Sequence, residues 1–136
     1  MADDTDLLHA AHRARLMAHA PYSNFLVGAA VLADDGQVYL GCNVENVAYP
    51  EGVCAEAVAL GAMVVGGGRR VVAIAVAGGP AGPPRPCQPC GGCRQKIAEF
   101  ATAETVVLTG GEDGAIDRRL AHDLLPARFE LDPPGA

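Results

Sequence analysis

Three cysteines and a glutamate in the middle of the chain are the residues best suited to chemistry. Cys54-Ala55-Glu56 is followed later by Cys90 and Cys93, which belong to the segment Pro-Cys-Gly-Gly-Cys. Three thiolates can hold one zinc ion and leave its fourth tetrahedral position open to water, whereas structural zinc sites usually have four protein ligands. Water bound there loses a proton near neutral pH, and a neighbouring carboxylate can carry that proton. The pattern indicates an open metal site with Glu56 beside it.

Two further cysteines leave other interpretations open. Cys87 and Cys90 form a Cys-x-x-Cys, the spacing of a thioredoxin-like redox pair. Such redox pairs normally lie at the start of a helix. The two glycines directly after Cys90 are poor helix formers and therefore argue against a redox pair. A closed structural site that includes Cys87 as a fourth ligand is the other alternative, and it would leave Glu56 without a role. We expect Cys42, at a strand end, to be a small buried hydrophobe.

Length and charge limit the classes of protein to consider. A chain of 136 residues is about one ordinary domain, which we expect to span residues 1–136. The formal net charge of −6 and a single lysine argue against nucleic acid as a partner. The acidic N-terminus lacks the features of a signal peptide, and no apolar stretch reaches the roughly 18 residues of a membrane span. We therefore expect a cytoplasmic protein with free or metal-bound thiols and no membrane partner.

The first third of the sequence predicts a helix and a β-hairpin. Apolar residues recur at helical spacing after the capping candidates Asp4 and Thr5, and this helix is expected to end near Ala20, before a proline. Strands are predicted at 27–33 and 38–42, because an Asp-Asp-Gly turn lies between two apolar runs.

The remaining elements place the cysteines at helix starts. We predict helices at 54–65, at about 93–101 and at 120–125, and strands at 71–77 and 105–109. This order indicates a mixed sheet covered by helices. Cys54 would begin one helix and Cys90 with Cys93 the next, so two positive helix ends would favour the thiolate forms.

Several motifs in the same order are shared with a known family. They are Ala20-Pro21-Tyr22-Ser23-Asn24-Phe25, Val27-Gly28-Ala29-Ala30, Gly41-Cys42-Asn43-Val44-Glu45-Asn46, Cys54-Ala55-Glu56, Pro89-Cys90-Gly91-Gly92-Cys93-Arg94-Gln95 and Leu124-Leu125-Pro126. With these motifs the chain resembles the small homotetrameric cytidine deaminases whose zinc ligands are all cysteines. The resemblance implies an α/β fold, a three-layer α-β-α sandwich with a mixed five-stranded sheet.

The resemblance also implies a reaction and a metal. One Zn²⁺ per chain would be held by Cys54, Cys90 and Cys93, and cytidine or 2′-deoxycytidine would be hydrolysed to uridine or 2′-deoxyuridine with loss of ammonia, a step of pyrimidine salvage. Water activated at the metal would attack C4 of the pyrimidine, while Glu56 protonates N3 and later the departing amino group.

Substrate contacts are carried over residue by residue from the same resemblance. Asn43 and Glu45 match positions that bind the ribose 3′-hydroxyl, Phe25 matches the position that packs on the base, and Ala55 is a further expected contact. In the tail, Phe129 would reach a neighbouring subunit's pocket, as would the Ala48-Tyr49 segment. The resemblance therefore implies a homotetramer with shared active sites, in which Tyr49 and Phe129 are substrate-binding residues.

One departure from the family pattern concerns the metal. Many all-cysteine members carry Arg directly after the catalytic Glu, where it donates hydrogen bonds to the sulfurs, but this chain has Ala57. Three uncompensated thiolates would make zinc a weaker Lewis acid, and the helix ends and Arg94 are the groups that could compensate.

Two alternatives to a cytidine deaminase stay open. One is a deaminase of a related substrate such as blasticidin S, whose enzymes share the Cys-Ala-Glu and Pro-Cys-x-x-Cys signature. The segment Asn43-Val44-Glu45-Asn46 favours the nucleoside. The other is a non-catalytic zinc or thiol-redox protein.

Overall fold

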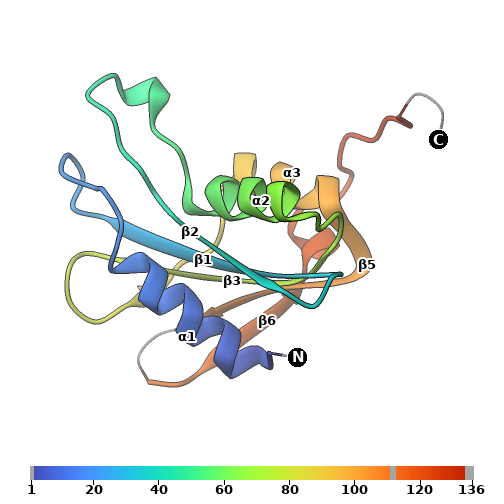
Figure 1. Cartoon of the computed structure of the whole chain (residues 1–136), viewed down its shortest axis with the longest axis horizontal. Coiled ribbons are helices and arrows are strands. Elements are labelled where there is room, and N and C mark those ends of the chain that lie inside the picture. Colours follow the sequence, from blue (N-terminus) through green and yellow to red (C-terminus); the bar gives the residue numbers. More distant parts are fainter. Residues whose placement is uncertain (1, 111–112, 134–136) are drawn as a thin grey trace.

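The helices lie on both faces of a central sheet and give three layers (Figure 1). The computed structural model describes residues 2–110 and 113–133. Helix α1 (Asp4–Arg15) covers one face, and α2 (Ala55–Gly66) and α3 (Gly91–Phe100) cover the other. The α/β three-layer α-β-α sandwich expected from the sequence is confirmed. Among the described residues, no helix is long and apolar enough to cross a membrane.

The sheet is mixed, as expected. The strands are β1 (Leu26–Ala33), β2 (Val38–Cys42), β3 (Val71–Gly79), β4 (Arg85–Pro86), β5 (Ala101–Gly110) and β6 (Ile116–Leu120). Five of them form the main sheet in the order β2-β1-β3-β5-β6, in which only the β3–β5 pair is parallel. The two-residue β4 pairs with β3 at Ala77 and Gly78, beyond the last β3–β5 pair, and makes a sixth strand that the sequence did not predict.

Two apolar cores, one on each face of the sheet, hold the layers together. Alternate residues of one strand enter opposite cores: Ala29 and Val31 pack toward α2 and α3, whereas Ala30 and Leu32 pack toward α1. β3 is divided in the same way. Strands buried on both faces are near-continuous apolar runs, as the sequences of β1 and β3 are.

Two glycines let helices approach the strands closely. A Cβ on Gly28 of β1 would lie 2.1 Å from the Ala11 carbonyl oxygen and 2.3 Å from the Arg15 nitrogen, both in α1. On β2, a Cβ on Gly41 would lie 2.4 Å from the carbonyl oxygen of Ala55. The start of α2, which carries the Cys-Ala-Glu motif, therefore packs directly on the hairpin.

The first helix differs from its prediction at both ends. Its N-cap is Asp3, whose side chain forms a capping box with Asp6, and not Asp4 or Thr5. The helix ends at Arg15 and not near Ala20. The reason lies at His19, whose amide donates to the Asn43 carbonyl (3.0 Å) and whose carbonyl accepts from the Glu45 amide (2.8 Å). The chain leaves the helix to pair with the segment after β2.

The second half contains four further differences. α3 begins at Gly91, because Cys90 is its N-cap and the Arg94 amide donates to the Cys90 carbonyl (2.9 Å). β5 follows directly from Ala101. β6 was not predicted, and the short helix predicted at 120–125 is the 3-10 helix η2 (Ala121–Leu124).

Candidate active site

Two helix starts bring three sulfurs together. Cys54 is the N-cap of α2, Cys90 is the N-cap of α3, and Cys93 lies in the first turn of α3. Their Sγ atoms all lie within 4.8 Å of one another. Tetrahedral zinc with Zn–S bonds of about 2.3 Å requires S···S separations of about 3.8 Å, which these side chains can reach by small movements. The donor set and its spacing fit one zinc ion.

The environments of the three thiols differ. The pKa of the Cys90 thiol is lowered, mainly by interaction with the Cys93 backbone amide at the start of α3. Burial raises the pKa values of Cys54 and Cys93. Because zinc binds the thiolate forms, binding would release protons from the two thiols of raised pKa, Cys54 and Cys93.

Glu56 lies in the first turn of α2, next to the sulfurs. Its side chain is buried, with 4% of the residue exposed. Burial raises the pKa of the carboxyl, because a low-polarity environment disfavours its charged form. A carboxyl in this position is suited to accept and return a proton.

A cleft of about 330 Å³ joins these groups to the predicted substrate contacts. Its lining residues are Val27, Asn43, Val44, Glu45, Tyr49, Gly52, Val53, Cys54, Ala55, Glu56, Cys87, Gln88 and Cys90. The structure therefore gathers Asn43, Glu45, Tyr49 and Ala55 around the cleft that contains Cys54, Cys90 and Glu56. These are the residues that the sequence selected from four separate motifs.

Asn43 and Glu45 follow β2 and hold the loop before β1. Asn43 Oδ1 accepts from the Val27 amide (2.8 Å), and its Nδ2 donates to the Phe25 carbonyl (2.9 Å). Glu45 Oε1 accepts from the amides of Tyr22 (2.9 Å) and Ser23 (3.1 Å).

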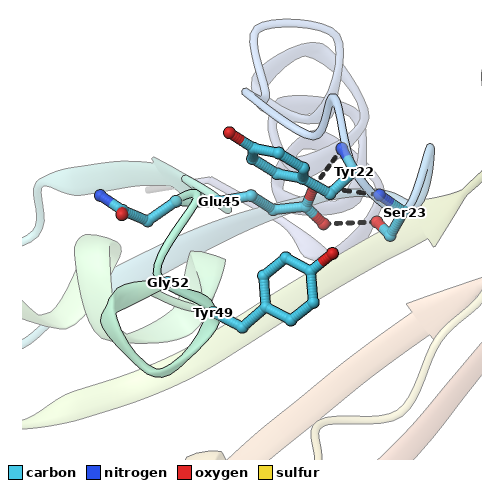
Figure 2. Close-up of a pocket in the computed structure, with 6 residues that line it drawn as sticks. Tyr22, Ser23, Glu45, Tyr49 and Gly52 are labelled. Carbon is cyan, nitrogen blue, oxygen red and sulfur yellow. Dashed lines mark hydrogen bonds between the residues drawn. The ribbon is translucent and has the colours of Figure 1, made fainter.

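The Ser23 hydroxyl is the third donor to this carboxylate. It donates to Glu45 Oε2, as the dashed lines in Figure 2 show. The pKa of Glu45 is lowered, first by this hydroxyl and then by the two backbone amides. Glu45 is therefore held as a carboxylate, and its pKa is shifted in the direction opposite to that of Glu56.

A second hollow of about 270 Å³ continues from the cleft and shares Glu45, Tyr49 and Gly52 with it (Figure 2). Tyr49 begins the 3-10 helix η1 (Tyr49–Glu51) and meets the Tyr22 ring edge-on, at a centroid distance of 5.8 Å. Tyr49 is 75% exposed. In the single chain it thus lies at the outer rim of its own cleft.

The structure does not bring Phe25 and Phe129 into the lining of this cleft. Phe25 lies just outside, where its ring and the Cys87 sulfur both approach Gly78: a Cβ there would stand 3.2 Å and 2.8 Å from them. Phe129 lies in the tail after η2 and is 76% exposed. Its position in one chain leaves it free to contact another.

Cys87 and Gln88 line the cleft but were not among the predicted site residues. The Cys-x-x-Cys spacing was the signal for Cys87. Its sulfur is not part of the three-cysteine cluster, so a closed four-cysteine site is not what the described residues form. Gly91 and Gly92 do not keep a helix from beginning directly after Cys90, as the case against a redox pair had assumed: both lie in the first turn of α3. Cys42 is half-buried at the end of β2 and not fully buried as expected.

Neither Ala57 nor Arg94 is among the residues that line the cleft. Ala57 lines a groove between α2 and α3 with Lys96 and Glu99. Arg94 donates from Nε to the Pro89 carbonyl (2.8 Å) and from an Nη to the Leu124 carbonyl (3.1 Å). These bonds place Arg94 as a support for the loop before Cys90.

Comparison with known proteins identifies the class to which this fold and site belong. Residues 1–109 match the family model described as the cytidine and deoxycytidylate deaminase zinc-binding region. A cytidine deaminase of Sporosarcina psychrophila is 42% identical over 130 residues, which covers 96% of this chain and 93% of the relative. One of Halalkalibacterium halodurans is 46% identical over 126 residues, with 93% of each chain covered.

Solved structures of cytidine deaminases are similar to this chain over nearly its whole length. The crystal structure of cytidine deaminase from Burkholderia pseudomallei has a TM-score of 0.83 at 42% identity and covers 95% of this chain and 100% of that chain. The enzyme from Mycobacterium tuberculosis has a TM-score of 0.82 at 40% identity, with 96% and 100% covered. The chain belongs to the cytidine and deoxycytidylate deaminase family, and the match to its zinc-binding region includes all three cysteines of the cluster.

Proposed function

We propose that this chain hydrolyses cytidine and 2′-deoxycytidine to uridine and 2′-deoxyuridine, with release of ammonia, in pyrimidine salvage. The observation that carries the proposal is the position of Glu56, a buried carboxyl that lines the same cleft as Cys54 and Cys90. The relatives named cytidine deaminase, which cover nearly the whole chain, support the same activity.

Glu56 moves the protons in the proposed reaction. Cys54, Cys90 and Cys93 would hold the zinc ion, which would supply a water of lowered pKa as the nucleophile for C4 of the pyrimidine. Glu56 accepts one proton of that water and delivers it to N3, then takes the second proton from the new C4 hydroxyl and passes it to the amino group, which leaves as ammonia. The raised pKa of Glu56 supports this role, because a carboxyl that holds a proton between steps must not be a strong acid.

Asn43 and Glu45 are proposed to bind the 3′-hydroxyl of the sugar, and their existing hydrogen bonds limit what else they can hold. The Asn43 amide already uses one N–H and one acceptor site, so one N–H remains. Glu45 accepts three hydrogen bonds, which leaves one acceptor site on Oε2. This pair can donate to and accept from a single hydroxyl, and therefore supports use of both ribose and 2′-deoxyribose.

The proposed enzyme is a cytoplasmic homotetramer of single-domain chains spanning residues 1–136, with active sites shared between subunits. Large apolar side chains on the surface support an assembly: Val47 is 77%, Phe129 is 76% and Leu131 is 80% exposed. In this assembly Phe129 and Tyr49 reach a neighbour's pocket, and Phe25 packs on the base. Light scattering should give the mass of four chains.

Phe129→Ala tests the shared site. Loss of a ring that contacts the substrate across subunits should raise the KM for cytidine about tenfold, since burial of an aromatic side chain contributes on the order of 1.5–3 kcal/mol. Phe129→Tyr keeps the ring and serves as the control. An unchanged KM in the alanine variant would contradict the role of Phe129.

The activity itself is tested by the ultraviolet spectrum of cytidine incubated with the purified, zinc-loaded protein, beside blasticidin S and a Glu56→Gln variant. Conversion of cytidine to uridine by the unaltered chain alone is the expected result. Conversion of blasticidin S without conversion of cytidine would reject the nucleoside as substrate. Conversion of neither would leave a non-catalytic zinc protein.

A further inference from the structure

Gln88 connects the loop before Cys90 to the far edge of the sheet. Its Nε2 donates to Thr109 Oγ1 (3.1 Å) and to Asp117 Oδ2 (3.0 Å). Thr109 on β5 and Asp117 on β6 are directly opposite each other in the antiparallel register. One side-chain amide therefore joins a cleft residue to a cross-strand pair.

The chemistry of Asp117 fixes the orientation of this amide. A carboxylate only accepts hydrogen bonds, so the NH₂ group of Gln88 must face it. Arg119 Nε also donates to Asp117 Oδ2 (2.8 Å). The pKa of Asp117 is lowered, first by Arg119 and then by Gln88, so the acceptor is charged at neutral pH and the hydrogen bond is charge-assisted.

The loop needs such anchors because it has little regular structure. Residues 87–90 lie outside any helix or strand, between the two-residue β4 and α3. Arg94 holds the Pro89 carbonyl from the α3 side. Gln88 holds the same loop from the sheet side, two residues before the ligand Cys90.

We propose that Asp117 is a positioning residue for the metal loop: through Gln88 it keeps Cys90 beside the other two ligands and keeps the cleft wall at Cys87 and Gln88 in shape. Asp117 is part of neither the metal cluster nor the cleft lining, and it reaches both through its hydrogen bond to Gln88. The inference deepens the proposed function, on which its activity readout rests.

The test measures zinc release and kinetics in the zinc-loaded enzyme. Asp117→Ala and Gln88→Ala should each speed transfer of zinc to a chromogenic chelator, and lower kcat/KM for cytidine, by about fivefold, the effect of one lost hydrogen bond. The double variant should be no worse than either single one, because both remove the same contact. Asp117→Asn keeps an acceptor for Gln88 and should lie within about twofold of the unaltered chain.

Glu104→Ala is the matched control, an exposed carboxylate on β5 in a groove away from the cleft. It should leave zinc release unchanged, and circular dichroism checks that each variant is folded. Three results would each overturn the proposal. Zinc release could be unchanged in Gln88→Ala, or the effects of the two single variants could multiply fully in the double variant. The third is an Asp117→Asn protein as impaired as Asp117→Ala. If the unaltered chain fails to deaminate cytidine, the proposed function fails, while zinc release still decides the role of Asp117.

Discussion

Glu56 and Glu45 line one cleft, yet their pKa values are shifted in opposite directions. Burial raises that of Glu56, and the Ser23 hydroxyl with two amides lowers that of Glu45. Environment alone thus gives two carboxyl groups of the same type two different tasks. One can exchange protons near the metal, and the other remains an acceptor for the sugar.

Glu56→Gln should keep zinc and fold but reduce kcat by about three orders of magnitude, because the amide cannot carry the proton. The measurements are zinc content and initial rates with cytidine. Glu99→Gln, an exposed position on α3, is the control and should retain full activity. Near-normal turnover in the Glu56 variant would reject the proposed proton path.

Ser23→Ala should shift the acid limit of substrate binding to higher pH. Because the pKa of Glu45 is lowered in the folded chain, the contribution of its carboxylate is present at neutral pH and is lost as pH falls through that folded-state value. Removing the Ser23 hydroxyl, the largest cause of the lowering, raises the pKa of Glu45. The carboxylate form is then lost at a higher pH as the solution is acidified. KM for cytidine between about pH 4 and 7 measures this shift. Ser23→Thr, which keeps the hydroxyl, should behave as the unaltered chain, and coincident profiles for the alanine variant would contradict the assignment.

At the scale of elements, close contact between helices and strands sets the geometry of the site. α1 approaches β1 at Gly28, and α2 approaches β2 at Gly41. The second contact places Ala55 and its neighbours Cys54 and Glu56 at the end of the hairpin. Asn43 and Glu45 follow directly after that end.

Gly28→Ala should destabilise the fold by about 3 kcal/mol, because the new Cβ meets backbone atoms of α1 that side-chain movement cannot relieve. Gly61→Ala is the matched comparison: it lies inside α2, and a Cβ there meets nothing within 4 Å. It should increase stability by up to about 1 kcal/mol. Urea unfolding measures both free energies, and equal values for the two variants would refute the packing argument.

Strong local signals made part of this arrangement predictable. The Asp-Asp-Gly turn predicted the hairpin, and the helix after Cys54 was placed within a residue of its observed bounds. β6 was missed because three of its five residues are charged and it lies at an exposed edge of the sheet, where apolar alternation is not required. The end of α1 was missed because backbone pairing of His19 with a distant segment decides it.

In the candidate site, too, features set by local sequence were predicted and those set by distant contacts were not. Cysteine spacing and motif order predicted the three-cysteine cluster and the cleft residue Glu56. The link from Gln88 to Asp117 depends on a strand that was not predicted. Local chemistry is readable from the sequence, but contacts between distant segments require the fold.

Over the whole molecule, stability and chemistry have separate sources. The two cores on either face of the sheet consist of apolar side chains from all three helices and the central strands. The three cysteines lie at the starts of α2 and α3, and none of them belongs to either core cluster. A chain of this length can bury enough surface to fold without a metal.

Removal of zinc by a chelator should therefore abolish deamination but leave the circular dichroism spectrum and most of the thermal stability intact. Restoring zinc should restore activity, which serves as the control for damage during chelation. Cooperative unfolding on chelation, as in small zinc-stapled domains, would contradict this separation.

The metal ligands and Glu56 come from two helix starts, while Asn43, Glu45 and Tyr49 come from residues 43–53 between β2 and α2. Three of the proposed substrate contacts thus lie in one contiguous, mostly exposed stretch of eleven positions, separate in the sequence from the proposed catalytic groups. This modularity makes the stretch a compact target for directed evolution toward modified sugars, with the reaction itself held constant.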